Sequence, residues 1–198
     1  LDTVPVGGES VVGRDRVHRE FDGVAFGSLV PLKDNKGKLS TAVSDCRDVL
    51  NDWGFDDLPL HVLGSSSSAI PLLAAVGADT VDSASYIHSA INGKYCTSLY
   101  SSEPVDDADF SRCDCPVCSD PVLVRRMKGD AEYQKDKLGA VAMHNLIIQK
   151  REVERIRAAI QQPGTDGLTE YIEQSLGRQQ SMQQHAHRVV NESLGGYF

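Results

Sequence analysis

The chain has 198 residues and a formal net charge of -8, with 40% hydrophobic and 24% charged residues. This composition is that of a folded globular protein, and the negative charge excludes a generally basic coat for nucleic acid. No stretch approaches the ~18 consecutive apolar residues that a transmembrane helix needs.

The first residues have neither the basic start nor the apolar run of a signal peptide. We therefore expect a cytoplasmic protein that is not associated with a membrane. Because the sequence begins at Leu1 rather than Met, we expect it to be a fragment of a longer protein.

The first third of the chain predicts strands separated by helical or looped segments. Residues 3–6 are apolar and β-prone, residues 13–20 form a polar helical stretch, and residues 23–27 have the small and apolar side chains of a fully buried strand. Ser40 is expected to cap a helix that continues to Leu50.

The alternation continues with tighter connections. Residues 58–64 predict a short strand, residues 65–68 are four serines suited to cap a helix, and residues 69–76 predict that helix. Gly77 ends it, and residues 80–84 begin another strand within three residues. Strand, helix and strand in this order predict a parallel sheet or a (β/α) barrel.

Asp82 lies at the C-terminal end of the last of these strands. Barrels of parallel strands place their catalytic groups at that end. Taken alone, however, Asp82 is interpreted as an ordinary strand end.

The character of the sequence changes after Tyr100. Residues 101–110 are acidic and predict a linker, and the chain is expected to be helical from Asp130 onward. A last amphipathic helix is predicted from about Leu168 to Val190.

Three of the five cysteines lie within six residues, at Cys113, Cys115 and Cys118. Thiolates at this spacing, with a turn-forming proline between them, are typical ligands of tetrahedral zinc. His144 on a predicted helix is a candidate for the fourth ligand. The remaining candidates, which spacing alone does not exclude, are His61, His88, His185 and His187.

A set of three cysteines and one histidine is closed, without a position for water. It predicts a structural zinc ion rather than a catalytic one.

Basic side chains gather on the helix that follows His144. They are Lys150, Arg151, Arg155 and Arg157. They predict a phosphate-contacting face on an otherwise acidic protein, while the interleaved Glu152 and Glu154 fit an ordinary solvated helix equally well.

Several segments, in the right order, resemble the guanine transglycosylase family, whose members exchange guanine for a 7-deazaguanine in nucleic acid. The resemblance covers nearly the whole chain. The matching segments are residues 23–32 (GVAFGSLVPL), 60–64 (LHVLG), 77–86 (GADTVDSASY), 113–120 (CDCPVCSD), 144–146 (HNL) and 152–160.

The resemblance implies an α/β fold, namely part of a (β/α)8 TIM-type barrel with a zinc-binding, mainly helical C-terminal subdomain. Residues 1–100 would be the C-terminal portion of the catalytic barrel, and residues 101–198 the zinc-binding subdomain with its closing helices. It also implies His144 as the fourth zinc ligand and a homodimer.

Carried over residue by residue, the resemblance makes Asp82 the nucleophile that attacks the sugar C1′ as guanine leaves, forming a covalent intermediate. The loop at Gly27, Ser28 and Leu29 would contact the purine through backbone groups, and Leu63 would pack under its ring.

The sequence departs from the family pattern in places. The family's acid near the reaction centre and the Asp that recognises the base are expected upstream of Leu1, and Val6-Gly7 or Gly7-Gly8 stands where many members have Gln-Gly. Residues 83–88 replace a Pro-Thr-Arg loop of the bacterial, queuosine-forming members and are closer to the archaeal type, which makes archaeosine. We expect no appended RNA-binding domain of the archaeal kind, so an enzyme that modifies DNA is kept as an alternative.

The expected function is therefore that of a glycosyltransferase, specifically a pentosyltransferase, that replaces guanine with a 7-deazaguanine in tRNA. The same exchange on DNA is an alternative within the enzyme class. A non-catalytic, zinc-binding partner subunit of such an enzyme is the alternative from another class, although such a subunit has no need of Asp82.

Overall fold

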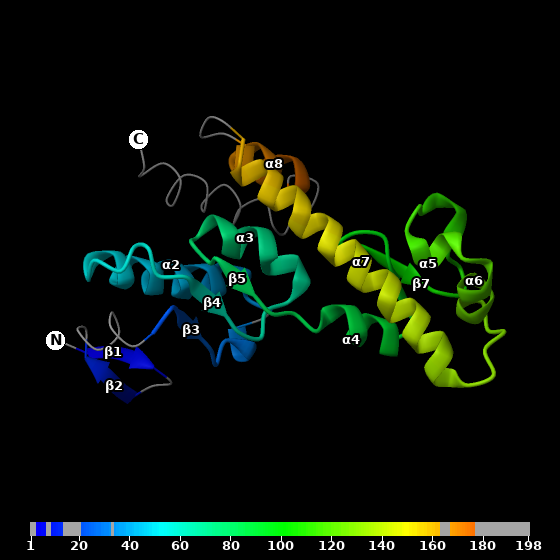
Figure 1. Cartoon of the computed structure of the whole chain (residues 1–198), viewed down its shortest axis with the longest axis horizontal. Helices are drawn as coiled ribbons and strands as arrows, with labels where there is room; N and C mark the ends of the chain where they lie inside the picture. Colours follow the sequence, from blue (N-terminus) through cyan, green and yellow to red (C-terminus); the bar gives the residue numbers. More distant parts are fainter. Residues whose placement is uncertain (1–2, 7–8, 14–20, 33, 163–166, 177–198) are drawn as a thin grey trace. The chain divides into compact units, whose positions relative to one another are not determined.

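The computed structural model describes residues 3–6, 9–13, 21–32, 34–162 and 167–176 (Figure 1). The chain divides into two compact units. Unit 1 comprises Leu1–Ser83 and Ala158–Phe198, and unit 2 comprises Ala84–Arg157. Both α-helices and β-strands are present, so the architecture is mixed α/β, as predicted.

Unit 1 contains an antiparallel pair of strands and a small parallel sheet with helices. Its elements are β1 (Thr3–Val6), β2 (Glu9–Gly13), β3 (Val24–Phe26), η1 (Val30–Leu32), α2 (Lys36–Asp52), β4 (Leu60–Val62), η2 (Ser67–Ala69), α3 (Ile70–Ala75), β5 (Thr80–Val81) and α8 (Gly167–Leu176). The η elements are single turns of 3-10 helix.

The parallel sheet has the order β3-β4-β5. Val24 pairs with Leu60, and His61 pairs with Thr80. The predicted parallel arrangement of these three strands is confirmed. The prediction that the first of them is fully buried is wrong, because β3 lies at one edge of this sheet among the described residues and Ala25 is exposed.

Helix α2 begins earlier than the sequence predicted. Asn35 caps it, since its side chain accepts a hydrogen bond of 3.0 Å from the backbone N–H of Lys38. Ser40 is therefore not a cap but a buried residue inside the helix. The predicted end of the next helix is confirmed, because Gly77 follows α3 with a φ of 93°, in the left-handed region that favours glycine.

The buried side chains of unit 1 come from the sheet, its helices and the loop after α2. They include Leu39, Val43, Leu50, Phe55, Leu60, Val62, Leu72, Leu73 and Ile172. Leu60 and Val62 of β4 are both buried, so the core anchors the strand that precedes the Leu63–Gly64 turn.

Unit 2 contains a hairpin and a set of helices. Its elements are α4 (Ser85–Ile91), β6 (Lys94–Cys96), β7 (Ser102–Pro104), η3 (Phe110–Arg112), α5 (Pro116–Ser119), α6 (Pro121–Met127) and most of α7 (Gln134–Ile160). The predicted acidic linker over residues 101–110 is wrong in part, because residues 102–104 pair antiparallel with β6.

A separate apolar core holds unit 2 together. Tyr95, Val105, Phe110, Cys115, Met127 and Val141 are among its buried residues. The three clustered cysteines thus belong to a packed region rather than to an exposed loop, since Cys113 and Cys118 pack against the cluster that contains Cys115.

Some predictions concern residues that the structure does not describe. These are the helical stretch within residues 14–20, the helix beyond residue 176, and the histidines His185 and His187. Within the described part of the chain, no helix is both long and apolar enough to cross a membrane.

Candidate active site and metal centre

The C-terminal ends of β3, β4 and β5 lie at one edge of the parallel sheet. The backbone N–H of Leu63 donates to the carbonyl of Phe26 at 2.9 Å, and the N–H of Asp82 donates to the carbonyl of Val62 at 3.2 Å. Consequently, the segments that begin at Gly27, Leu63 and Asp82 leave the sheet side by side, where parallel α/β folds place their ligands.

Asp82 is exposed at this edge and is held by the neighbouring turn. The backbone N–H of Gly64 donates to Asp82 Oδ1, and Ser65 Oγ donates to the backbone carbonyl of Asp82 at 2.8 Å. The turn needs glycine, because Gly64 has a φ of 74° and a Cβ there would lie 2.9 Å from Val30 Cγ2.

The loop after β3 also has unusual backbone geometry. Ser28 has a φ of 61°, and it alone among the described non-glycine residues has a positive φ. Such a conformation costs free energy and is found disproportionately at binding sites. A Cβ on Gly27 would lie 3.4 Å from Leu63 Cδ1, so the backbone of Gly27 and the half-exposed Leu63 are close neighbours.

Leu29 differs from the rest of this loop. Its side chain is 4% exposed and belongs to the core. Any contact from Leu29 to a ligand is therefore made through its backbone.

Arg47 and Asp79 form an ion pair that connects several segments of unit 1, away from this edge of the sheet. Arg47 donates to the carbonyls of Gly77 and Leu58, and its Nη2 lies 2.5 Å from Asp79 Oδ2. The same carboxylate accepts the backbone N–H of Leu60 at 2.8 Å. Asp79 therefore fastens the start of β4 to α2.

The candidate metal centre lies wholly within unit 2. Cys113, Cys115, Cys118 and His144 each offer one ligand atom, and these four atoms lie within 4.8 Å of one another. Cys115 is the N-cap of the short helix α5, and its Sγ accepts the backbone N–H of Cys118 at 3.4 Å. The helix turn thus aims both sulfurs to the same side.

The distances suit a tetrahedral ion. His144 Nδ1 lies 3.4 Å from the sulfurs of Cys115 and Cys118 and 3.9 Å from that of Cys113. With Zn–S near 2.3 Å and Zn–N near 2.0–2.1 Å, a tetrahedron has S–N edges of about 3.6 Å. The four residues therefore fit zinc.

The imidazole of His144 is oriented for coordination. Its Nε2 lies 2.9 Å from the carbonyl oxygen of Cys96 and donates to it, which leaves the lone pair of Nδ1 facing the sulfurs. Burial lowers the pKa of His144, so the ring is kept in the neutral form that a metal ligand requires.

The residue after His144 holds the strand that carries this carbonyl. Asn145 is 2% exposed, and its Oδ1 accepts the backbone N–H of Cys96 at 2.8 Å. Its Nδ2 donates to the carbonyls of Lys94 and Tyr86 at 3.0 and 3.2 Å. One amide side chain thereby satisfies three backbone groups.

The other candidate histidines that the structure describes lie elsewhere. His61 Nδ1 is 2.7 Å from Thr80 Oγ1 on the parallel sheet, and His88 is exposed on α4. Neither belongs to the group of possible ligands.

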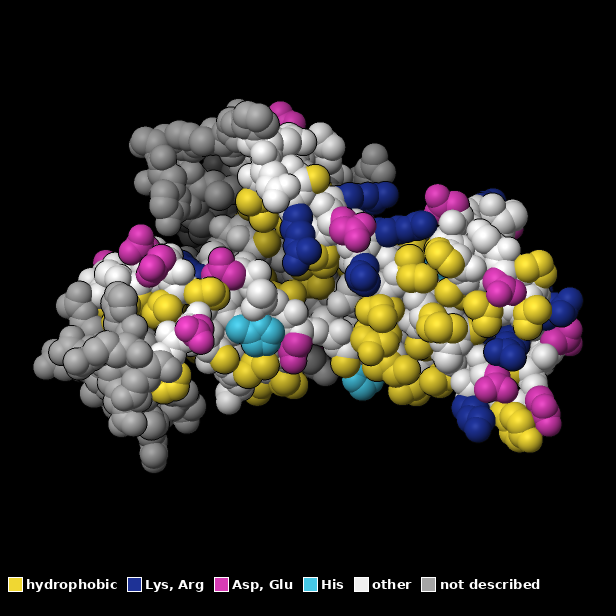
Figure 2. Space-filling model, viewed as in Figure 1, with side chains coloured by type: hydrophobic (Ala, Val, Ile, Leu, Met, Phe, Trp, Pro, Cys, Tyr) yellow, Lys and Arg dark blue, Asp and Glu magenta, His cyan; other side chains and the backbone are white. Residues whose placement is uncertain are grey.

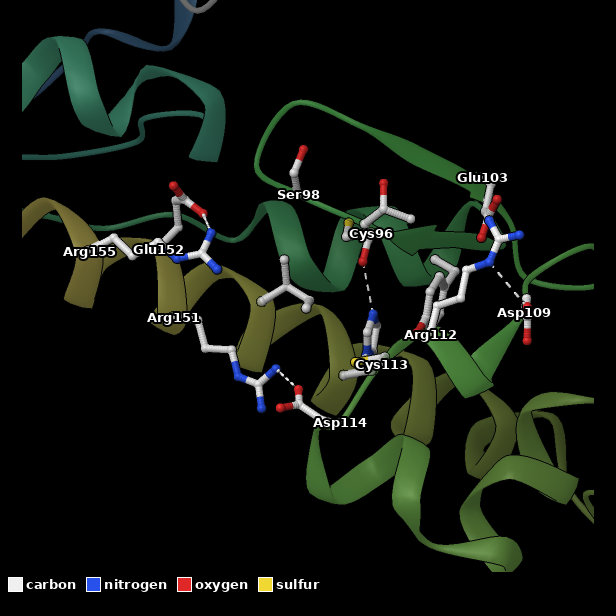
Figure 3. Close-up of a pocket in the computed structure, with 14 residues that line it drawn as sticks. Cys96, Ser98, Glu103, Asp109, Arg112, Cys113, Asp114, Arg151, Glu152 and Arg155 are labelled. Atoms are coloured by element: carbon white, nitrogen blue, oxygen red, sulfur yellow. Dashed lines mark hydrogen bonds and ion pairs between the residues drawn. The ribbon is translucent and has the colours of Figure 1, made fainter. Parts of the chain in front are cut away.

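Two of the predicted phosphate-binding side chains form ion pairs within unit 2. Arg151 Nη1 lies 2.5 Å from Asp114 Oδ1, and Arg155 Nη1 lies 3.0 Å from Glu152 Oε2 (Figure 3). The hydrogen bond from Arg151 lowers the pKa of the Asp114 carboxyl. Lys150 and Arg157 are exposed on the same helix.

These pairs line a cavity of about 440 Å³ next to the metal ligands, together with the ion pair between Arg112 and Asp109 (Figure 3). Acidic and basic groups alternate around it. The cavity is therefore not a simple anion site.

Comparison with known proteins identifies the class of this fold and site. Residues 11–181 match the profile of the family described as "Queuine tRNA-ribosyltransferase". Because this match covers most of the chain, the chain belongs to that family, as the resemblance in the sequence implied.

Three of its relatives are archaeal proteins named tRNA-guanine(15) transglycosylase. The chain is 35% identical to that of Aeropyrum pernix over 113 residues (56% of the chain, 20% of the relative). It is 30% identical to that of Haloarcula marismortui over 149 residues (74% and 29%). It is 31% identical to that of Haloferax volcanii over 166 residues (82% and 30%). The chain thus spans less than a third of the length of these relatives.

Proposed function

We propose that the chain provides the nucleophile-bearing edge of the catalytic barrel, and the zinc subdomain, of a tRNA-guanine transglycosylase. The observation that carries this is the placement of Asp82 beside the Gly64 turn and the Gly27–Ser28 loop, at the C-terminal ends of three parallel strands. Family membership and the names of the relatives support it. The division into barrel and zinc subdomain at residue 100 is part of the same proposal.

The proposed reaction exchanges one base for another with retention at the sugar. A carboxylate oxygen of Asp82 attacks C1′, the bond from C1′ to N9 of guanine breaks, and its electron pair leaves with the base, which takes a proton from an acid. The corresponding nitrogen of a 7-deazaguanine then gives its proton to the conjugate base of that acid, attacks C1′ and displaces the carboxylate. Two displacements through a covalent intermediate replace a single more difficult one.

In the proposed reaction, the backbone N–H of Gly64 orients the nucleophile. It holds one oxygen of Asp82 and so fixes the plane of the carboxylate before substrate arrives. A charged acceptor with a backbone donor is one of the stronger kinds of hydrogen bond. Fixing the nucleophile reduces the entropy lost on reaching the transition state.

The neighbouring loop is the proposed base site. The strained backbone at Ser28, the small Gly27 and the half-exposed Leu63 offer polar backbone groups around an apolar floor, as a flat heterocycle requires. Leu29 contributes its backbone, because its side chain is in the core.

Zinc at Cys113, Cys115, Cys118 and His144 is the proposed cofactor, and its role is structural. The ion would join the α5 turn to α7, so that removing it loosens unit 2 rather than changing the chemistry at Asp82. Cys115→Ser should therefore lose zinc by elemental analysis and lower the melting temperature, while Cys46→Ser, at a half-buried cysteine outside the cluster, should keep both. Full zinc content in Cys115→Ser would contradict the site.

Polyanion binding is proposed for Lys150, Arg151, Arg155 and Arg157. Figure 2 shows Lys and Arg side chains gathered along the stretch that Figure 1 draws as α7, with an acidic group among them. Lys150 and Arg157 are the exposed positive charges that support the proposal, whereas Arg151 and Arg155 would have to exchange their carboxylate partners for phosphate. Binding should weaken as salt concentration rises.

The nucleophile is tested by covalent trapping on a guanine-containing tRNA, read as a complex that survives denaturation. Asp82→Asn keeps an oxygen for the Gly64 N–H but cannot form a stable glycosyl ester, so trapping should disappear. Asp57→Asn, at an exposed acid on another loop, is the matched control and should trap normally. Persistent trapping by Asp82→Asn would remove Asp82 from this role.

The same assay distinguishes the polymers. Incorporation of a labelled 7-deazaguanine into tRNA supports the proposal, and incorporation into DNA alone would replace tRNA by DNA as substrate. Sedimentation of the same preparation tests the homodimer that the family resemblance implies.

A further inference from the structure

Tyr95 on β6 touches two of the four proposed metal ligands. Its ring is stacked on the imidazole of His144, with ring centroids 3.8 Å apart and planes inclined by 6°. Its hydroxyl oxygen lies 3.2 Å from Cys118 Sγ. Tyr95 is 3% exposed, so both contacts are shielded from water.

The direction of the hydroxyl contact follows from the chemistry of the site. A metal-bound cysteine is a thiolate, which has lone pairs but no proton, so the phenol must be the donor. The stacked ring, in turn, restricts rotation of the imidazole about its own bond to Cβ. Cys118 and His144 come from segments 26 residues apart, and one side chain bridges them.

We propose that Tyr95 is a positioning residue of the metal centre, which holds the His144 ring in plane and donates a hydrogen bond to the Cys118 thiolate. This inference rests on the proposed zinc site. It adds a residue outside the four ligands that affects two properties of the site: the affinity for the ion and the electron density at the Cys118 sulfur.

The surroundings fix Tyr95 in turn. The ring of Phe110 meets it edge to face, with centroids 5.2 Å apart and planes at 86°. On the next residue of β6, the N–H of Cys96 donates to Asn145 and the carbonyl accepts from His144. One strand therefore supplies both the ring that stacks on the imidazole and the acceptor that selects its tautomer.

If Tyr95 only filled space in the core, its replacement would change the stability of the protein and nothing else. A donor to a thiolate also lowers the energy of the sulfur lone pair, which changes the sulfur-to-metal charge-transfer energy of a cobalt(II)-substituted site. This spectral band separates the two roles, because packing by itself leaves it in place.

The test compares Tyr95→Phe with the unmodified protein, both loaded with zinc or with cobalt(II). The variant keeps the ring and the stacking but lacks the hydroxyl. We expect zinc affinity, measured by competition with a chromophoric chelator, to fall about tenfold, and the cobalt charge-transfer band to move to longer wavelength. Tyr95→Leu, which also removes the stacked ring, should lose about a hundredfold.

Tyr133→Phe is the matched control, because Tyr133 lies in the same unit and is 54% exposed. It should change neither quantity. If the unmodified protein binds no zinc, the proposed metal site fails. If it binds zinc and Tyr95→Phe matches it in affinity and cobalt spectrum, the role of Tyr95 alone fails. A loss of affinity with an unshifted cobalt band would also overturn it, since the hydroxyl would then act through folding only.

Discussion

Replacement of Asn145 by alanine should destabilise unit 2 more than any surface change of the same size. The substitution removes the partners of three backbone groups, at Cys96, Lys94 and Tyr86. Leaving a buried polar group without its hydrogen bond costs roughly 1–3 kcal/mol. Because the contact with Tyr86 is the longest, we count the other two in full and expect a loss of about 3–5 kcal/mol.

The assay is urea denaturation followed by circular dichroism, with zinc at a fixed concentration. Hydrogen exchange read by mass spectrometry adds local information, since the amides of residues 94–104 should lose protection first. Asn92→Ala is the matched control, because Asn92 is exposed and makes one side-chain bond, to the His88 carbonyl at 2.9 Å. Its effect should stay below about 0.5 kcal/mol. Equal effects of the two substitutions would refute the reasoning.

Two further predictions concern unit 1. Arg47→Met should cost about 2–4 kcal/mol of stability, because the Arg47 side chain is 11% exposed and its loss takes the guanidinium donors from the carbonyls of Gly77 and Leu58 and the ion-pair partner from Asp79. Thermal denaturation measures this, and an unchanged melting temperature would contradict it. Gly64→Ala should cost about 1–2 kcal/mol of stability, because of the positive φ at this position and the contact with Val30. It should also lower the yield of covalent trapping, because it displaces the Gly64 N–H from Asp82. Trapping at the original yield would contradict that role.

Local signals in the sequence were sufficient to predict the parallel sheet. The runs that became β3, β4 and β5 are short, apolar and bounded by turn residues, and the connection through Gly77 leaves little freedom. The predicted N-cap of α2 was wrong by five residues, because Asn35 and Ser40 are both good caps and only the backbone conformation decides between them.

Contacts between distant segments were harder to predict. The spacing of the three cysteines indicated a metal, but spacing could not choose among the histidines; family resemblance implied His144, and the geometry places it with the sulfurs. Asn145 lies in the matching segment 144–146, but no local pattern predicts the contacts of Tyr95 or Asn145, because their partners lie on segments 23 to 59 residues away. Strand β7 was taken for part of an acidic linker for the same reason, since it is stabilised by pairing with β6 rather than by its own composition.

The metal ligands on α5 and α7 have a consequence for the unfolded chain. A bond from one ion to both Cys118 and His144 closes a loop whose ends are 26 residues apart and which contains α6. On the expression used for covalent cross-links, a loop of that size removes about 3.5 kcal/mol of chain entropy from the denatured ensemble. Zinc would thus act as a reversible substitute for a disulfide, one that a chelator can open without any change in redox conditions.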